Sequence, residues 1–140
     1  MPIDYLELPM QYDDLSSVDL NLLISTQSWQ AKYRLILQWS ELIKVKPALQ
    51  KPEHILKGCE VDSWIKTEIT NQSQQFLFDS QSKLIKGLAA IILVQLNGQP
   101  REFIRTWNGE EFLQKTQLQK HMTPSRNNGL LALIGFCKGC

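Results

Sequence analysis

The sequence lacks any apolar stretch long enough to cross a lipid bilayer. Its longest apolar run, from Leu88 to Val94, is far shorter than the roughly 20 residues that a transmembrane helix needs. The first residues, Met1 to Tyr5, also lack the basic start and the apolar segment of a secretory signal peptide. We therefore expect a cytoplasmic protein that does not associate with a membrane.

An excess of one charge is also missing. The 140 residues carry 15 Lys and Arg against 14 Asp and Glu, a formal net charge of +1. Without a basic stripe, nucleic acid is not an expected partner. Apolar residues make up 43% of the chain and charged residues 21%. This balance and length predict one globular domain over residues 1–140.

Cysteine is scarce, with only Cys59, Cys137 and Cys140 in the chain. An odd number of cysteines in a reducing compartment argues against a disulfide framework, so at least one free thiol is expected. The CxxC pair at the C-terminal end is a pattern seen in redox and zinc sites. Zinc would need two more ligands, and only Cys59, His54 and His121 remain, at scattered positions. We expect an ordinary helix end there and no metal site.

Helical patterns occupy the first third of the chain and its last half. Residues 18–27 predict a short helix, and Ser28 is placed to cap a longer one that runs to about residue 44. On that longer helix, polar residues recur at three- and four-residue steps and predict an exposed stripe. The stripe consists of Gln30, Arg34, Gln38, Glu41 and Lys44.

The most apolar helix is expected in the middle of the chain, where Asp79 or Ser80 is placed to cap it. It is apolar nearly all round and runs to Leu96, which predicts a central, buried position. Shorter helices are predicted to begin at Pro100 and to span residues 110–116. Thr123 as N-cap, followed by Pro124 at the first helical position, predicts the start of the last helix.

Alternating apolar and polar residues between these helices indicate strands. Residues 61–69 alternate with period two, Asn71 and Gln72 form a turn, and residues 74–78 supply an antiparallel partner. Residues 55–57 are placed to add a short third strand. The sequence therefore predicts an α+β fold, in which helices cover one side of a small antiparallel sheet.

Cys59 is the residue whose surroundings suggest chemistry. Gly58 before it permits a positive φ and a sharp turn, and the expected strand begins just after it. A thiol reacts as its thiolate, and with a pKa of ~8.5 only a few per cent is thiolate at neutral pH unless a cation or helix N-terminus is near. By position alone, a small buried hydrophobic side chain is the more common role for such a cysteine.

From Trp29 to Leu133, about three quarters of its length, the chain resembles the SufE/CsdE family of sulfur acceptors for cysteine desulfurases. Five pieces occur in the order and spacing of that family, which makes the resemblance specific. They are Trp29-Gln30-Ala31-Lys32-Tyr33-Arg34, Gly58-Cys59-Glu60 with Trp64, Asp79-Ser80, Ile85-Lys86-Gly87-Leu88, and His121-Met122-Thr123-Pro124-Ser125-Arg126 with Gly129-Leu130.

The resemblance implies an IscU/SufE-like α+β fold with a three-stranded antiparallel sheet. It also implies that Cys59 takes sulfur from a SufS- or CsdA-type desulfurase as a persulfide and activates that enzyme. The sulfur would pass to a downstream acceptor or scaffold in Fe–S cluster assembly. The chain would then be a sulfur carrier without a cofactor of its own and not a conventional enzyme, since the PLP belongs to the desulfurase.

The resemblance also implies roles for residues outside the cysteine loop. Arg126 matches a family arginine in the first turn of the last helix, where its charge would favour the thiolate if it reaches Cys59. An arginine that binds backbone carbonyls or an acid remains the alternative. His121 is expected to be structural, and Asp79 to cap its helix rather than contact a partner.

Two departures from the family pattern leave the identity of the desulfurase open. Gln81-Ser82 stands where family members often have Asp-Ala, so a carboxylate is lost beside the expected docking surface. Glu60, where some members carry glutamine, suggests the CsdE-like branch.

Two other functions remain as alternatives. An Fe–S scaffold of the IscU type shares the predicted α+β outline, but it needs about three converging cysteines. A cysteine hydrolase would pair Cys59 with a histidine, and neither a third orienting residue nor an oxyanion motif is evident.

Overall fold

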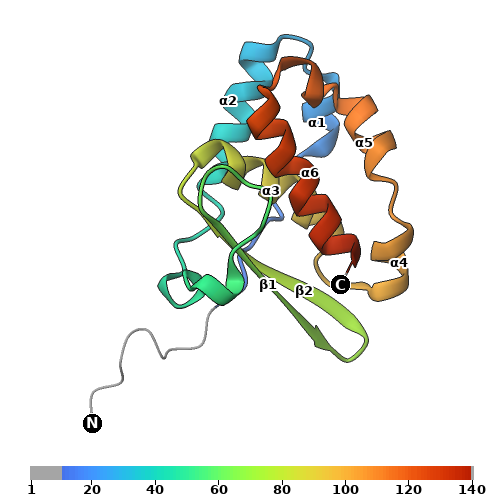
Figure 1. Cartoon of the computed structure of the whole chain (residues 1–140). Helices are drawn as coiled ribbons and strands as arrows, with labels where there is room; N and C mark the ends of the chain where they lie inside the picture. The colour runs from blue at the N-terminus through green and yellow to red at the C-terminus, as the bar shows by residue number, and fades with distance from the viewer. Residues whose placement is uncertain (1–10, 140) are drawn as a thin grey trace.

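The computed structural model describes residues 11–139 of the chain, so Cys140, the second cysteine of the CxxC pair, lies outside the described residues. The fold is α+β, as predicted (Figure 1). In chain order its elements are α1 (Leu20–Ser25), α2 (Trp29–Ser40), the 3-10 helices η2 (Pro47–Leu49) and η3 (Pro52–His54), β1 (Ser63–Thr70), β2 (Ser73–Ser80), α3 (Lys83–Leu96), β3 (Gln99–Pro100), α4 (Arg101–Thr106), α5 (Gly109–Thr116), the 3-10 helix η4 (Leu118–His121) and α6 (Pro124–Gly139).

The sheet is three-stranded and antiparallel, in the order β1-β2-β3. Strands β1 and β2 form a long hairpin that projects from the helices (Figure 1), and Asn71 and Gln72 turn it with φ values of 50° and 69°. The third strand is β3, and the prediction of a strand at residues 55–57 is wrong. Only Ile55 bridges to β1, because Gly58 then takes a φ of +96° and turns the chain away.

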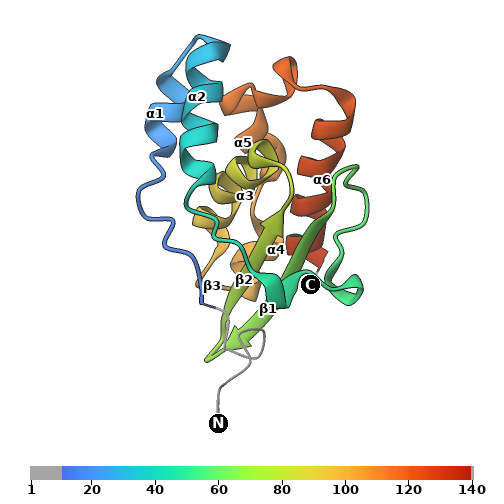
Figure 2. The same ribbon diagram turned by 90° about the vertical axis from the view of Figure 1, so that its left-hand side faces the viewer.

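Helix α3 occupies the centre of the molecule, with α2 on one side and α6 on the other (Figure 2). Ten of its residues are buried, which confirms the prediction of a central helix. Gly87 allows the close approach of α2, because a Cβ at that position would lie only 2.1 Å from the carbonyl oxygen of Ile36. The close packing of α2 on α3 therefore requires glycine at position 87.

Both faces of the sheet are covered near the start of β1, whereas helices were expected on one side only. Ile65 packs into the main core with the helices. Its neighbour Trp64 points to the other face and packs with Leu49 and Leu77 in a second cluster, beneath η2. Toward the hairpin turn the cover ends, and Ile69 is 54% exposed. The alternation of β1 therefore separates two buried faces rather than one buried and one solvated face.

The N-caps of the two long helices test the capping predictions. Ser28 caps α2 by accepting a hydrogen bond from Ala31 N, and the predicted polar stripe of that helix is exposed. The helix ends at Ser40, earlier than predicted, because residues 41–43 continue with shorter-range turn bonds. The cap of α3 is Ser82 and not Asp79 or Ser80, since strand β2 runs through Ser80 before the helix begins.

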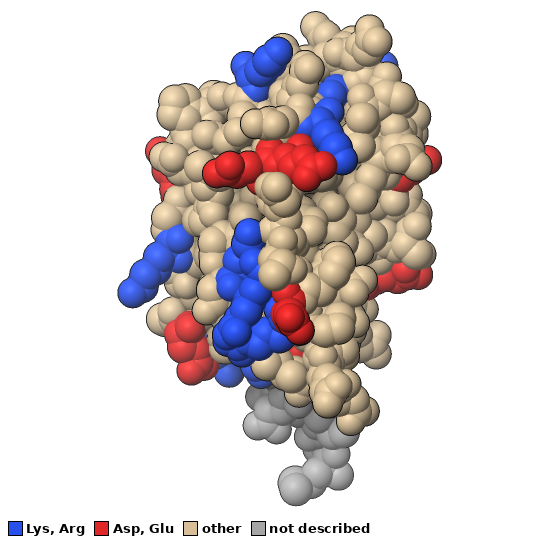
Figure 3. Space-filling view, turned by 90° about the vertical axis from the view of Figure 1, so that its right-hand side faces the viewer, with Lys and Arg blue, Asp and Glu red and all other residues tan. Residues whose placement is uncertain are grey.

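The surface carries both charge signs. On the face shown in Figure 3, basic and acidic residues lie interspersed among a larger area of uncharged residues. This mixture matches the near balance of the two signs in the sequence. Among residues 11–139, no helix has both the length and the apolar character that crossing a membrane requires.

Candidate functional site

The Cys59 loop lies against helix α6. Gly58 has the positive φ that the sequence suggested, and a Cβ on it would lie 3.1 Å from the Cβ of Ala132 on α6. Figures 1 and 2 both show this loop beside α6. A larger residue at position 58 would therefore meet both backbone strain and the helix.

The thiol itself rests on a second glycine. Cys59 is half-buried, and its Sγ donates a weak hydrogen bond to the carbonyl oxygen of Gly129, at 3.9 Å. A Cβ at position 129 would lie 3.3 Å from this sulfur and 3.3 Å from Cδ1 of Ile85. Gly129 thus leaves the space that the thiol occupies. In the sequence this glycine stands out only as part of a motif, although a glycine inside a predicted helix is itself a signal of close packing.

Cys59 opens into a pocket of about 360 Å³ between its loop, the start of α3 and the start of α6. Arg126 lines the same pocket, so the structure brings the two predicted site residues together. Val61 and Ile85 supply the apolar part of the lining, while Ile55 and Leu56, which precede the cysteine in the chain, do not line the pocket. The full lining is Cys59, Glu60, Val61, Ser82, Ile85, Thr123, Ser125, Arg126 and Gly129.

Two helices begin at this pocket. Ser82 caps α3 by accepting from Ile85 N at 3.2 Å, and Thr123 caps α6 by accepting from Arg126 N at 3.4 Å. Both cap residues line the pocket. The positive ends of two helix dipoles and the guanidinium of Arg126 therefore line the cavity together with one acidic residue, Glu60, so the positive groups that favour an anion outnumber the negative one.

The resting thiol is nevertheless held in its neutral form. Burial raises the pKa of Cys59 above its ordinary value, and a hydrogen bond with the side chain of Ser63 opposes this rise only in part. A buried thiolate loses hydration that the protein does not fully replace. In the closed loop the thiol is therefore protonated at neutral pH and is a poor nucleophile.

The remaining candidate residues lie apart from the pocket. His121 stacks on Trp29, with ring centroids 5.0 Å apart and an interplanar angle of 19°, which fits the structural role expected for it. Cys137 is buried in the core on α6. Among residues 11–139, no group of three or more His, Cys, Asp and Glu side chains is arranged to hold a metal ion. The scaffold alternative thus lacks a ligand set in the described part of the chain.

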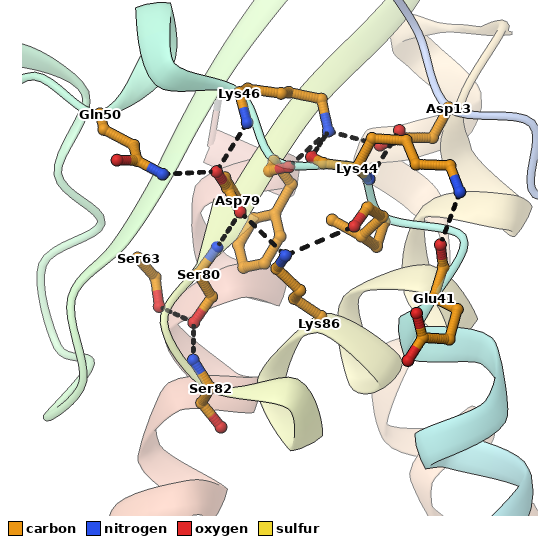
Figure 4. Close-up of polar contacts among 12 residues, drawn as sticks. Asp13, Glu41, Lys44, Lys46, Gln50, Ser63, Asp79, Ser80, Ser82 and Lys86 are labelled. Carbon is orange, nitrogen blue, oxygen red and sulfur yellow. Dashed lines mark hydrogen bonds and ion pairs between the residues drawn. The ribbon is translucent and has the colours of Figure 1, made fainter.

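Asp79 has a different role from the predicted one. Ser82 caps α3 in its place, and at 1% exposure Asp79 does not reach the surface. Figure 4 shows its carboxylate accepting hydrogen bonds from Lys46 N and Gln50 Nε2, both at 2.8 Å, and from Ser80 N at 2.8 Å. Lys86 Nζ completes the set at 3.3 Å. Burial acts to raise the pKa of Asp79, but these donors and the charge of Lys86 outweigh it and hold that pKa below its ordinary value.

Lys46, which no sequence pattern singled out, connects this cluster to the N-terminal segment. Its ammonium group donates to Asp13 at 2.6 Å, to the Phe78 carbonyl at 2.8 Å and to the Lys44 carbonyl at 2.9 Å. The side chains of this ion pair are only 4% and 7% exposed. These contacts hold Asp13, residues 44–50 and residues 78–86 together (Figure 4).

Fold and site together define a small α+β protein that presents one half-buried thiol, on a glycine turn, to a pocket at two helix N-termini. Comparison with known proteins identifies the family to which such a protein belongs. Residues 20–138 match the SufE family, described as an Fe-S metabolism associated domain. The chain is 31% identical over 116 residues to a protein named cysteine desulfuration protein SufE from Wigglesworthia glossinidia brevipalpis, with 81% of each chain covered.

A solved structure agrees on the fold. The solution structure of a hypothetical protein from Thermus thermophilus superposes with a TM-score of 0.70, covering 92% of this chain and 94% of that one, at 16% sequence identity. The protein described here belongs to the SufE family. Its membership supports a role as a sulfur acceptor in Fe–S metabolism.

Proposed function

We propose that this protein accepts a sulfane sulfur on Cys59 from a PLP-dependent cysteine desulfurase of the SufS or CsdA type. It carries the sulfur as a persulfide through the cytoplasm to Fe–S cluster assembly or a related sulfur pathway. One observation supports this most directly: within a family match over residues 20–138, Cys59 lines a pocket that also contains Arg126 and the starts of two helices. The PLP stays with the desulfurase.

The transfer is a substitution at divalent sulfur. The Cys59 thiol first loses its proton, and its Sγ then attacks the outer sulfur of the persulfide on the desulfurase cysteine. A new S–S bond forms to Cys59 while the S–S bond in the desulfurase breaks, and the electron pair leaves with the desulfurase thiolate. No external oxidant or reductant is needed. Removing the persulfide also frees the desulfurase for its next turnover, which explains activation.

The geometry suits a carrier that is closed at rest. The neutral, half-buried thiol of Cys59 is shielded from oxidants, which attack exposed thiolates first. Its bond to the Gly129 carbonyl is long and weak, so little is lost when the loop opens toward a partner. Arg126 and the two helix starts are placed to stabilise the sulfur anion that forms on transfer.

Intact-mass analysis after incubation with the desulfurase and cysteine tests this function. We expect one added sulfur, about 32 Da, located on the peptide that contains Cys59. Cys59→Ser should abolish both the adduct and the stimulation of the desulfurase. A Cys137→Ser, Cys140→Ser double variant is the matched control and should retain both. The opposite pattern, with sulfur on the Cys59→Ser protein and none on the double variant, would assign the transfer to the C-terminal pair.

A further inference from the structure

Two opposite charges line the Cys59 pocket without pairing with each other. Glu60 directly follows the cysteine on its loop, and Arg126 lies in the first turn of α6. Both line the cavity together with Cys59. Among residues 11–139, neither side chain has an ion-pair or hydrogen-bond partner. Each charge is therefore available to a ligand in the cavity.

The two charges approach the sulfur from different walls of the cavity. The Sγ of Cys59 rests 3.9 Å from the carbonyl oxygen of Gly129 on α6. Arg126 precedes that glycine by three residues, which places it one turn earlier on the same face of the helix. Glu60 belongs to the loop, next to the cysteine itself. The cavity thus presents a cation from the helix, an anion from the loop and a thiol beside both.

The helix wall is suited to a carboxylate. The guanidinium of Arg126 offers a planar fork of N–H donors, which matches the two oxygens of a carboxylate. The first N–H groups of a helix have no partner within it. Thr123 accepts from that of Arg126, whereas the N–H of Ser125, another lining residue, has no hydrogen bond within the described part of the chain. The carboxylate of Glu60, in contrast, is suited to an ammonium group.

The size of the cavity limits the ligand to a small molecule. Its volume of about 360 Å³ lies near the lower end of the range of about 300–1,000 Å³ that is usual for small-molecule sites. Val61 and Ile85 add a short apolar part to the lining, which suits a methylene group. A molecule with one carboxylate, one ammonium group and one sulfur on a short carbon chain matches the groups that the cavity presents. Such a molecule is an α-amino-acid thiol.

We propose that this pocket binds a free α-amino-acid thiol of the cysteine class and that Cys59 passes its sulfur to this thiol as well as to protein partners. The carboxylate of the ligand binds Arg126, its ammonium group binds Glu60, and its sulfur faces Cys59. The binding stands by itself, whereas the transfer rests on the proposed function. Free cysteine is the substrate of a cysteine desulfurase, so it is present whenever that enzyme loads the carrier.

The transfer repeats the loading step with a different acceptor. The bound thiol loses its proton, and its sulfur attacks the outer sulfur of the Cys59 persulfide. A new S–S bond forms to the ligand while the S–S bond on Cys59 breaks. The electron pair of that bond stays on the Sγ of Cys59, which takes up a proton. The products are the resting thiol and the persulfide of the free amino acid, and no oxidant or reductant is needed.

Thiol–disulfide exchange with cystine tests the binding in the unloaded full-length protein. Cystine forms a mixed disulfide with Cys59 and releases cysteine, and peptide mass locates the product. Cystamine lacks the carboxylates of cystine, and dithiodipropionate lacks its amino groups. Each rate is divided by the rate in urea, because the leaving thiols differ in pKa. The normalised rate for cystine should exceed that for either analogue by about fivefold, the effect of a partly exposed ion pair.

Variants of the two charged residues assign this preference. Arg126→Ala should lower the normalised cystine rate to that of cystamine, and Glu60→Gln should lower it to that of dithiodipropionate. Arg105→Ala and Glu110→Gln make the same changes of charge at exposed positions outside the pocket and should keep the wild-type preference. Because rates of one protein with several disulfides are compared, a general change in thiol reactivity cancels. Equal normalised rates in the wild type, or a preference that both pocket variants retain, overturn the proposal.

The transfer is tested on protein that the desulfurase has loaded and that gel filtration has freed of enzyme and cysteine. Free cysteine is added, and the loss of the extra sulfur from Cys59 is followed by mass. This loss should be about fivefold slower in Glu60→Gln than in Glu110→Gln. Equal loss from these two loaded variants overturns the transfer and leaves the proposed function intact. A wild type that takes up no sulfur but still prefers cystine contradicts the proposed function and supports the binding site.

Discussion

The sulfur of Cys59 lies directly over Gly129, 3.9 Å from its carbonyl oxygen, at a point of helix α6 where a side chain would not fit without movement. The resting position of the thiol therefore depends on a residue seventy positions later in the chain. Packing of the loop on α6 at Ala132 secures the same arrangement one turn further along.

Gly129→Ala should displace the thiol toward solvent, because the new Cβ would come within 3.3 Å of Sγ and of Ile85. We expect alkylation of Cys59 by iodoacetamide to become faster in the absence of any partner. Gly135→Ala is the matched control on the same helix, where a Cβ meets nothing within 4 Å. It should stabilise the protein by up to about 1 kcal/mol through helix propensity and leave the thiol unchanged. Equal alkylation rates in both variants would contradict the contact.

The free protein should resist alkylation in a pH-dependent way. Because burial raises the pKa of Cys59, its alkylation midpoint should lie above the value of about 8.5 found for an exposed cysteine. At neutral pH a small maleimide should therefore react slowly, and addition of the desulfurase should accelerate the reaction by opening the loop. A urea-unfolded sample supplies the reference rate. Labelling of the folded protein at that reference rate would show that the thiol is not sheltered.

Patterns along the chain predicted the fold well where they are local. The periodicity of α2, the apolar α3, the Asn71-Gln72 turn and the Thr123-Pro124 helix start all depend on neighbouring residues, and all are confirmed. The third strand was misplaced because β3 has only two residues, Gln99–Pro100, and its pairing with β2 is set by where α3 ends. A two-residue strand has no period to detect.

The site was predicted only in part, for the same reason. Cys59 and Arg126 were found through the family resemblance, and the structure brings both to one pocket. Gly129 acquires its importance only when α6 meets the loop. Asp79 was mistaken for a helix cap because a carboxylate before a helix normally is one. The backbone N–H of Lys46 and the ammonium group of Lys86 instead hold its carboxylate at the end of strand β2.

The buried carboxylate of Asp79 should contribute to stability in a pH-dependent way. Its pKa in the folded protein lies below the value of about 3.9 expected when unfolded, so the unfolded chain binds the proton first as the pH falls. Its contribution is therefore fully present above about pH 4 and is lost as the pH drops through the lower folded pKa. Asp79→Asn should cost about 3 kcal/mol in the free energy of unfolding near neutral pH, since Lys86 loses its partner.

Urea unfolding at neutral pH and at about pH 3 measures this contribution, and the difference between Asp79→Asn and wild type should shrink in acid. Glu111→Gln is the control, because it breaks the exposed ion pair between Glu111 and Lys115. That change should cost less than about 1 kcal/mol. A difference at Asp79 that stays constant with pH would mean that hydrogen bonding, and not charge, accounts for its effect.

Arg126 supplies the last prediction. Its guanidinium lines the Cys59 pocket, while its backbone N–H caps the start of α6 by donating to Thr123. Arg126→Ala removes the charge and keeps the N–H, so the fold should survive with little change in thermal unfolding. Without the cation a sulfur anion is less favourable, so the pKa of Cys59 should rise and sulfur acceptance should slow. The difference from wild type should be largest at low salt.

Arg105→Ala makes the same change in charge at an exposed position on α4, away from the pocket, and should alter neither property. Alkylation of Cys59 as a function of pH, beside thermal unfolding of each variant, separates an electrostatic role of Arg126 from a structural one. A destabilised Arg126→Ala protein with an unshifted thiol titration would assign the arginine to packing. A shifted titration in a stable protein, reduced at about 0.5 M salt, would assign it to the sulfur anion, because salt screens exposed charges such as this guanidinium.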